Sequence, residues 1–206
     1  MHFLKKNKEL LLAGPPFILL LAFQDKAVMV WMKHLDQSRS SLYMLLRKLD
    51  PLINFIGHGT TLLVAAGLLF VVGKKFSAGL CYTGKALLLS FFAAGISVQL
   101  LKHLIGRARP RVTEGLMLIG PSLKGGYDSF PSGHSAVVFC FAFILAQQFQ
   151  GSRIIFYCIA VIISLMRVVD LSHFPSDVAA GAVFGVIVAK VLSENTFKTG
   201  TPVKWR

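Results

Sequence analysis

Six apolar segments divide this chain, and they constrain its fold more than any other feature. They cover roughly residues 9–24, 52–73, 84–104, 134–150, 153–170 and 177–193. A helix that crosses a bilayer needs about 20 apolar residues, with a range of about 17–25. A soluble protein of 206 residues has too little polar surface to enclose six such segments. The sequence therefore predicts an all-α, polytopic membrane protein with six transmembrane helices in one domain, 1–206.

The N-terminal region and the segment after it need separate interpretations. Lys5, Lys6 and Lys8 precede the first apolar segment, but no small-residue cleavage site follows, so we expect an uncleaved first helix. In residues 25–51, leucines recur at helical spacing with basic residues between them. These leucines are Leu42, Leu45, Leu46 and Leu49. The pattern predicts an amphipathic helix that lies on the outer membrane surface.

The charge of the chain limits its partners. The net charge is +13, which favours anionic partners such as acidic lipid headgroups or phosphorylated substrates. The basic residues stand in short clusters between apolar segments and form no single polar face, which argues against nucleic acid as the partner. Six helices put both termini on one side, and the distribution of Lys and Arg weakly favours the cytoplasm for it. The outer loops are then 25–51, 105–133 and 171–176.

Three short motifs fall at the outer ends of the predicted helices. They are Lys102-x6-Arg109-Pro110, Pro131-Ser132-Gly133-His134, and Arg167-x5-His173-x3-Asp177. The topology drawn from hydropathy places all three at the same membrane boundary. We therefore expect one site that is built from all three motifs.

The residue types in these motifs suit the binding of a phosphate group. Lys102, Arg109 and Arg167 can neutralise its charge, and Arg can hold two of its oxygens at once. Ser132 and Gly133 open a predicted helix, where unpaired backbone N–H groups and the helix dipole favour an anion. These five residues are the predicted phosphate-binding set.

Two histidines have different surroundings in the sequence, and this predicts different roles. Asp177 lies four residues after His173, in the first turn of a predicted helix, where its carboxylate can accept a hydrogen bond from one imidazole nitrogen. The other nitrogen of His173 is then free to attack phosphorus. His134 has no carboxylate nearby in sequence and suits a general acid that protonates the leaving oxygen. The predicted path runs through phospho-His173, which water then hydrolyses.

These motifs resemble those of the type 2 phosphatidic acid phosphatase superfamily, which also includes bacterial non-specific acid phosphatases and vanadium haloperoxidases. The family pattern is K-x6-RP, PSGH and SR-x5-H-x3-D. This chain departs from it only at Met166, where the family commonly has Ser. The resemblance implies the roles given above, and it implies that neither a metal nor another cofactor is needed.

The expected function is hydrolysis of a phosphate monoester or pyrophosphate of a membrane lipid. The substrates of similar proteins are phosphatidic acid, phosphatidylglycerol phosphate, undecaprenyl pyrophosphate and lipid A phosphates, and the sequence does not choose among them. The expected place is the bacterial inner (plasma) membrane, with the site on the periplasmic face. Two alternatives stay open: a lipid phosphotransferase with the same site, and a non-catalytic lipid-binding membrane protein.

Overall fold

The structure, a computed structural model, describes residues 8–198 of the chain, and the surroundings of side chains from 13 to 193. Over this part, seven α-helices and one short 3₁₀ helix follow one another, and no strand is present. The helices are α2 (Lys8–Ser38), α3 (Ser41–Gly57), α4 (Gly59–Phe76), α5 (Ala78–Ile105), α6 (Gly133–Gln148), η1 (Gln150–Ser152), α7 (Arg153–Val169) and α8 (Pro175–Lys198). The predicted all-α class is confirmed.

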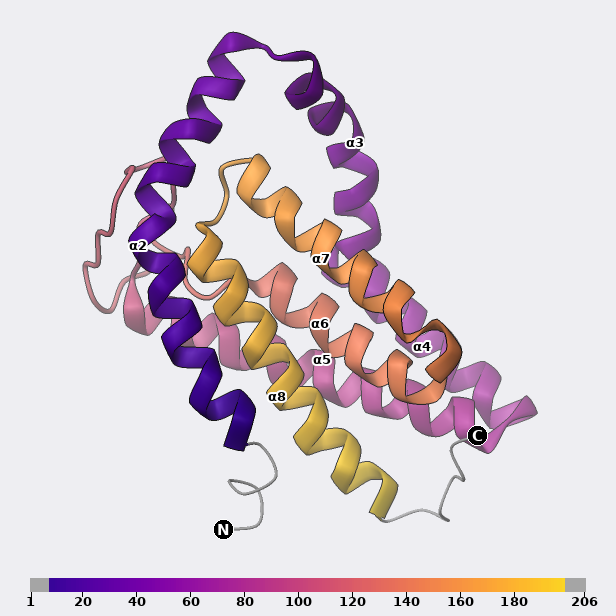
Figure 1. The fold of residues 1–206 in the computed structure, drawn as a ribbon. Coiled ribbons are helices and arrows are strands. Elements are labelled where there is room, and N and C mark those ends of the chain that lie inside the picture. Colours follow the sequence, from indigo (N-terminus) through magenta and orange to yellow (C-terminus); the bar gives the residue numbers. More distant parts are fainter. Residues whose placement is uncertain (1–7, 199–206) are drawn as a thin grey trace.

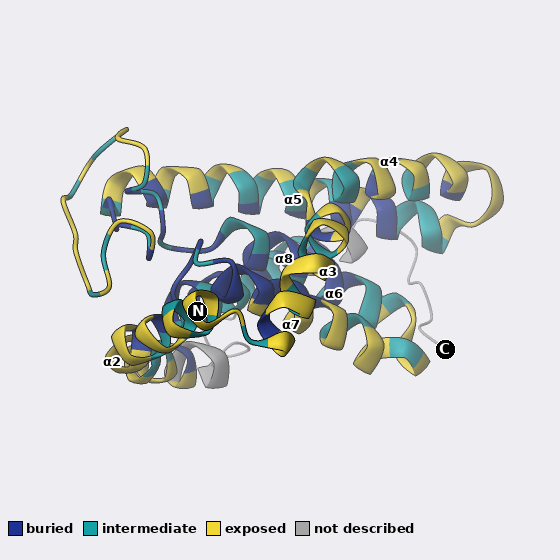
Figure 2. Ribbon diagram, turned by 90° about the horizontal axis from the view of Figure 1, so that it is seen from above, coloured by how far each residue is buried: buried dark blue, intermediate teal, exposed yellow. Residues whose placement is uncertain are grey.

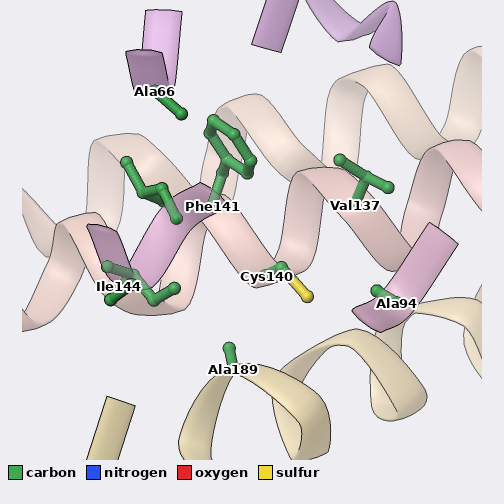
Figure 3. Packing of buried hydrophobic residues seen from close by; sticks show 9 residues of the cluster. Ala66, Ala94, Val137, Cys140, Phe141, Ile144 and Ala189 are labelled. Atoms are coloured by element: carbon green, nitrogen blue, oxygen red, sulfur yellow. The ribbon is translucent and has the colours of Figure 1, made fainter. Parts of the chain in front are cut away.

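Helix α6 lies in the middle of the bundle (Figure 1). It packs against α5, α7 and α8, while α4 packs on α5, α2 on α8, and α3 on α7. Figure 3 shows how small residues let these helices approach: Ala66, Ala94 and Ala189 surround Cys140 and Phe141 of α6. Close contact through small side chains is the usual way in which helices pack within a membrane, where lipid competes equally for apolar surface.

Apolar side chains also cover the outside of the bundle. Figure 2 shows exposed residues along the outer sides of α2, α3 and α4, with buried residues toward the middle. Five helices are long and apolar enough to cross a membrane: Ala13–Ser38, Gly59–Phe76, Ala78–Ile105, Gln150–Val169 and Pro175–Ser193. The remaining predicted span, 134–150, corresponds to α6, which is apolar but has only 16 residues. The predicted count of six is thus approximate.

The predicted surface helix over 25–51 is wrong in its bounds. Residues 25–38 continue α2, and a separate helix, α3, begins at Ser41 after a turn in which Arg39 has a positive φ of 48°. Asp25, at the start of the predicted surface segment, is buried and hydrogen-bonded to Arg107 and Ser176, so the helix continues through it. Helix α3 is amphipathic. Tyr43 and Leu46 pack near α7, whereas the other leucines of the pattern are exposed.

The connection from α5 to α6 is a loop, as predicted, and it lies at one end of the bundle beside α2 (Figure 1). Helix α5 ends at Gly106, whose φ of 60° is a conformation that favours glycine. An added Cβ at Gly106 would also stand 2.0 Å from the backbone oxygen of Gly120. An isolated bridge joins Arg107 to Leu118 and closes the loop onto itself. These contacts hold residues 107–109 against the ends of the helices.

Candidate active site

Most of the predicted site residues line one cavity of about 560 Å³ at the ends of the helices. The six that line it are Lys102, Arg109, Gly133, His134, Arg167 and His173. Lys102 comes from the last turn of α5, His134 from the first turn of α6, and Arg167 from the last turn of α7. Ser132 and Asp177 are fully buried and are not part of the cavity lining. The structure therefore brings the three motifs together, with two residues placed behind the cavity wall.

His173 lies in the short connection between α7 and α8, and its orientation differs from the one predicted. Its Nδ1 is 2.8 Å from the backbone oxygen of Ser129 and 3.8 Å from the Oδ2 of Asp177. The second distance is too long for a hydrogen bond. A carbonyl oxygen only accepts, so Nδ1 carries the hydrogen and donates it to Ser129. The neutral ring then has its lone pair on Nε2.

Asp177 is held by three donors other than His173. Its Oδ1 accepts a 2.5 Å hydrogen bond from Arg107 Nη1, and its Oδ2 accepts from the Ser129 hydroxyl at 2.5 Å and the Phe174 backbone N–H at 2.9 Å. Both Ser129 and Asp177 thus support His173. The carbonyl oxygen of Ser129 accepts a hydrogen bond from the imidazole N–H, and the Ser129 hydroxyl donates one to the carboxylate of Asp177. Asp177 acts on the ring through its charge at 3.8 Å.

The three cations of the cavity are paired with carboxylates from different elements. Arg109 donates two hydrogen bonds to Asp128, at 2.9 and 2.6 Å, and Lys102 Nζ lies 3.8 Å from the same carboxylate. Arg167 contacts one carboxylate and one amide of α3 and one carboxylate after α7. These partners are Asp50 at 2.8 Å, Asn54 at 3.1 Å and Asp170 at 3.1 Å.

The start of α6 forms part of the cavity lining, through Gly133 and His134. Ser132 is the N-cap of the helix, and its hydroxyl accepts hydrogen bonds from the backbone N–H and the hydroxyl of Ser135. Its side chain therefore caps the helix instead of facing the cavity. His134 lines the cavity, and its buried Nε2 has no hydrogen-bond partner in the structure. This nitrogen is available to a group that enters the cavity.

Charge and burial set the protonation states outside the spans. Burial lowers the pKa of His173. The negative charge of Asp177 raises this pKa, whereas the positive charges of Lys102 and Arg109 lower it further. The pKa of His173 is therefore below the usual imidazole value. Partial burial alone would raise the pKa of Asp128, but the hydrogen bonds and charge of Arg109, with the charge of Lys102, lower it. At neutral pH His173 is therefore neutral, and Asp128 is ionised.

Sequence reasoning missed several residues that build the site. Arg107, which belongs to none of the three motifs, is buried and pairs with Asp177 and Asp25. Its place between the helix-ending Gly106 and the motif residue Arg109 was the available signal. No signal in the sequence pointed to Ser129, because its contacts depend on how the loop folds. His58 and Asn54, which belong to none of the three motifs, also line the cavity.

No group of three or more His, Cys, Asp or Glu side chains in the described part of the chain is arranged to hold a metal ion.

Comparisons with known proteins find a matching family and several relatives. A family model described as the PAP2 superfamily matches residues 83–200. A Rhizobium etli protein named lipid A 1-phosphatase is 34% identical over 154 residues, which are 68% of this chain and 66% of that protein. A Bacteroides thetaiotaomicron lipid A 4′-phosphatase is 31% identical over 58% of this chain and 57% of its own length.

One solved structure is similar over nearly the whole chain. It is the crystal structure of a transmembrane PAP2 type phosphatidylglycerolphosphate phosphatase from Bacillus subtilis. The TM-score is 0.64, and the match covers 95% of this chain and 98% of that one. The sequence identity is 23%, so this likeness shows the fold, which is that of a multi-pass membrane protein. The family is shown by the PAP2 model, which spans more than half of the sequence, and the chain therefore belongs to the PAP2 superfamily.

Proposed function

We propose that this protein is a membrane lipid phosphatase that hydrolyses a lipid phosphate through a phospho-His173 intermediate. The observation that carries the proposal is the 2.8 Å contact between His173 Nδ1 and the Ser129 carbonyl oxygen. It assigns the ring proton to Nδ1 and the lone pair to Nε2, on a residue that lines a cavity with three cations. A neutral imidazole with an oriented lone pair is an activated nucleophile.

The first step forms one bond and breaks one. The lone pair of His173 Nε2 forms a bond to phosphorus, while the bond from phosphorus to the lipid oxygen breaks. His134 gives a proton to that leaving oxygen, and a phosphate dianion in the cavity favours the protonated imidazole that this requires. Lys102, Arg109 and Arg167 stabilise the charge on the phosphoryl oxygens.

The second step restores the enzyme. Water attacks the phosphorus of phospho-His173, and His134 takes a proton from that water. The bond between nitrogen and phosphorus breaks, inorganic phosphate leaves, and His173 regains its lone pair. In this scheme the chain's own cations do the work of charge neutralisation, so we expect turnover without added metal or other cofactor.

The substrate that the comparisons favour is a phosphate on a lipid of the lipid A type. Two Rhizobium relatives, 34% and 32% identical, are both named lipid A 1-phosphatase. This chain spans 66% and 63% of their lengths, which is slightly less than two thirds. The location that we propose is the bacterial inner membrane, with the cavity on the periplasmic face. The weak bias of Lys and Arg toward the other side supports it.

The experiment is a panel of lipid phosphates with purified protein in detergent and excess chelator. Lipid A, phosphatidylglycerol phosphate, phosphatidic acid and undecaprenyl pyrophosphate are tested in parallel, and both free phosphate and phosphorylated acceptor lipid are measured. We expect release of free phosphate, inhibition by vanadate, and phosphate trapped on His173 when the reaction is quenched. Phosphate on an acceptor lipid instead would identify a phosphotransferase.

The matched variants are His173→Ala, His134→Ala and His103→Ala. His103 is exposed and bonded to the Ser122 carbonyl, so its replacement controls for the loss of an imidazole near the site. We expect no turnover with His173→Ala, slow turnover with His134→Ala and near-normal turnover with His103→Ala. Normal rates with His173→Ala would overturn the proposal.

A further inference from the structure

Asp25 is a buried carboxylate in the middle of α2, a helix that is otherwise largely exposed. Its exposed fraction is 2%, whereas its neighbours Gln24 and Lys26 are exposed. A carboxylate inside a candidate membrane span is unfavourable unless it is paired, and ionisable residues at such positions commonly belong to functional sites. Helix α2 lies outside residues 83–200, which the PAP2 model matches, and no predicted motif includes Asp25.

The partners of Asp25 connect it to the candidate active site. Its Oδ2 accepts a 2.7 Å hydrogen bond from Arg107 Nη2 and one from the Ser176 hydroxyl, and its Oδ1 accepts from the Ser176 backbone N–H at 3.0 Å. The other arm of the same guanidinium, Nη1, donates to Asp177 Oδ1 at 2.5 Å and to the Ser176 hydroxyl at 2.7 Å. Arg107 therefore bridges two carboxylates from helices far apart in sequence.

The charges of this group leave one negative charge beside His173. Asp25 and Asp177 contribute two negative charges, and Arg107 contributes one positive charge. If Asp25 were neutral, Arg107 and Asp177 would form a neutral pair, and the positive charge of Arg107 would weaken the field of Asp177 at His173 Nδ1, which is 3.8 Å from the carboxylate. The imidazole needs that field when its Nε2 bonds to phosphorus, because the ring then becomes positively charged.

We propose that Asp25 is a positioning residue of the active site, acting through Arg107 on Asp177 and so on His173. It has two effects. Its hydrogen bonds fix the guanidinium that holds Asp177, and its charge offsets that of Arg107, so that Asp177 stabilises the cationic ring. The inference rests on the proposed phospho-His173 route, and it assigns to α2 a part in the chemistry of a site otherwise built from α3 to α8.

The main test is Asp25→Asn, which removes the charge and keeps the size. The control is Asp36→Asn, the same change at an exposed position of the same helix. We expect the rate of phospho-His173 formation in a single turnover to fall at least about tenfold, with little change in KM. We also expect the acid limb of kcat/KM to move to lower pH, because the protonated form of His173 loses part of its stabilisation.

The charged and titratable groups that face this part of the site are Asp177 and Arg107, the cations Lys102, Arg109 and Arg167, the carboxylate of Asp128, and His134. Of these, only the pairing of Arg107 changes directly in Asp25→Asn. The double variant Asp25→Asn with Arg107→Gln removes one negative and one positive charge and restores the net charge of −1 beside His173. We expect it to return the acid limb toward that of the wild type.

The outcomes separate this inference from the proposed function. If the wild type forms no phospho-His173 from any lipid, the proposed function fails. If the wild type forms it, and Asp25→Asn forms it at the same rate with the same acid limb, only the inference fails. If Asp25→Asn does not fold, the double variant decides: an acid limb displaced from that of the wild type overturns the charge argument.

Discussion

The contact between α6 and α8 leads to a prediction in which two effects of one substitution oppose each other. At Gly181 of α8, an added Cβ would lie 2.4 Å from the backbone oxygen of Ser132 and 3.1 Å from the Cβ of Ser135. Ordinary contacts begin at 3.4 Å, so α8 would have to move by about 1 Å at this point. The clashing oxygen belongs to the backbone and cannot rotate away.

Gly181→Ala should therefore lower both stability and activity. Alanine favours the helix by about 1 kcal/mol over glycine, while overpacking costs about 1–3 kcal/mol. The shift also reaches the site, because the backbone N–H of Ser132 donates to the Asp177 carbonyl at 3.0 Å. A misplacement of about 1 Å costs about 100-fold in rate. We expect kcat/KM to fall by about that factor.

Gly67→Ala in α4 is the matched control. An added Cβ at Gly67 has no neighbour within 4 Å, so it gains the same helix propensity without the clash. The assay compares the two variants, purified in detergent, for kcat/KM with one lipid substrate and for the midpoint of unfolding in a denaturing detergent. We expect Gly181→Ala to be about 1–3 kcal/mol less stable than Gly67→Ala. Equal stability and equal kcat/KM in the two variants would refute the reasoning.

Two further predictions concern charge. Arg107→Met removes the cation that pairs with two buried carboxylates, so it should lower the free energy of unfolding by about 3–5 kcal/mol. Arg47→Met, at an exposed position, should change it by less than about 1 kcal/mol. The unfolding measurement described above compares the two variants. The lowered pKa of His173 keeps the nucleophile neutral as the pH falls, so the acid limb of kcat/KM, corrected for titration of the lipid phosphate, should lie below pH about 6.5. A limb above that value would contradict the neutral imidazole.

The sequence by itself determined the fold class and identified six of the residues that line the cavity. Apolar segments of spanning length leave few arrangements, because each must cross the bilayer or pack on one that does. Alternating crossings bring the end of α5, the start of α6 and the end of α7 to one boundary. Lys102, His134 and Arg167 had to meet there for that reason, and no knowledge of their contacts was needed.

Only the tertiary structure decided which polar groups pair. Arg107 and Asp25 are 82 residues apart, and no periodicity connects a loop residue with a position in the first helix. The predicted partner of one imidazole nitrogen of His173 was Asp177, four residues later. In the structure, Nδ1 instead donates to the Ser129 carbonyl oxygen, 44 residues earlier. Hydrogen bonds are short and directional, so a partner is chosen by sub-ångström placement of the backbone, which hydropathy and spacing do not contain.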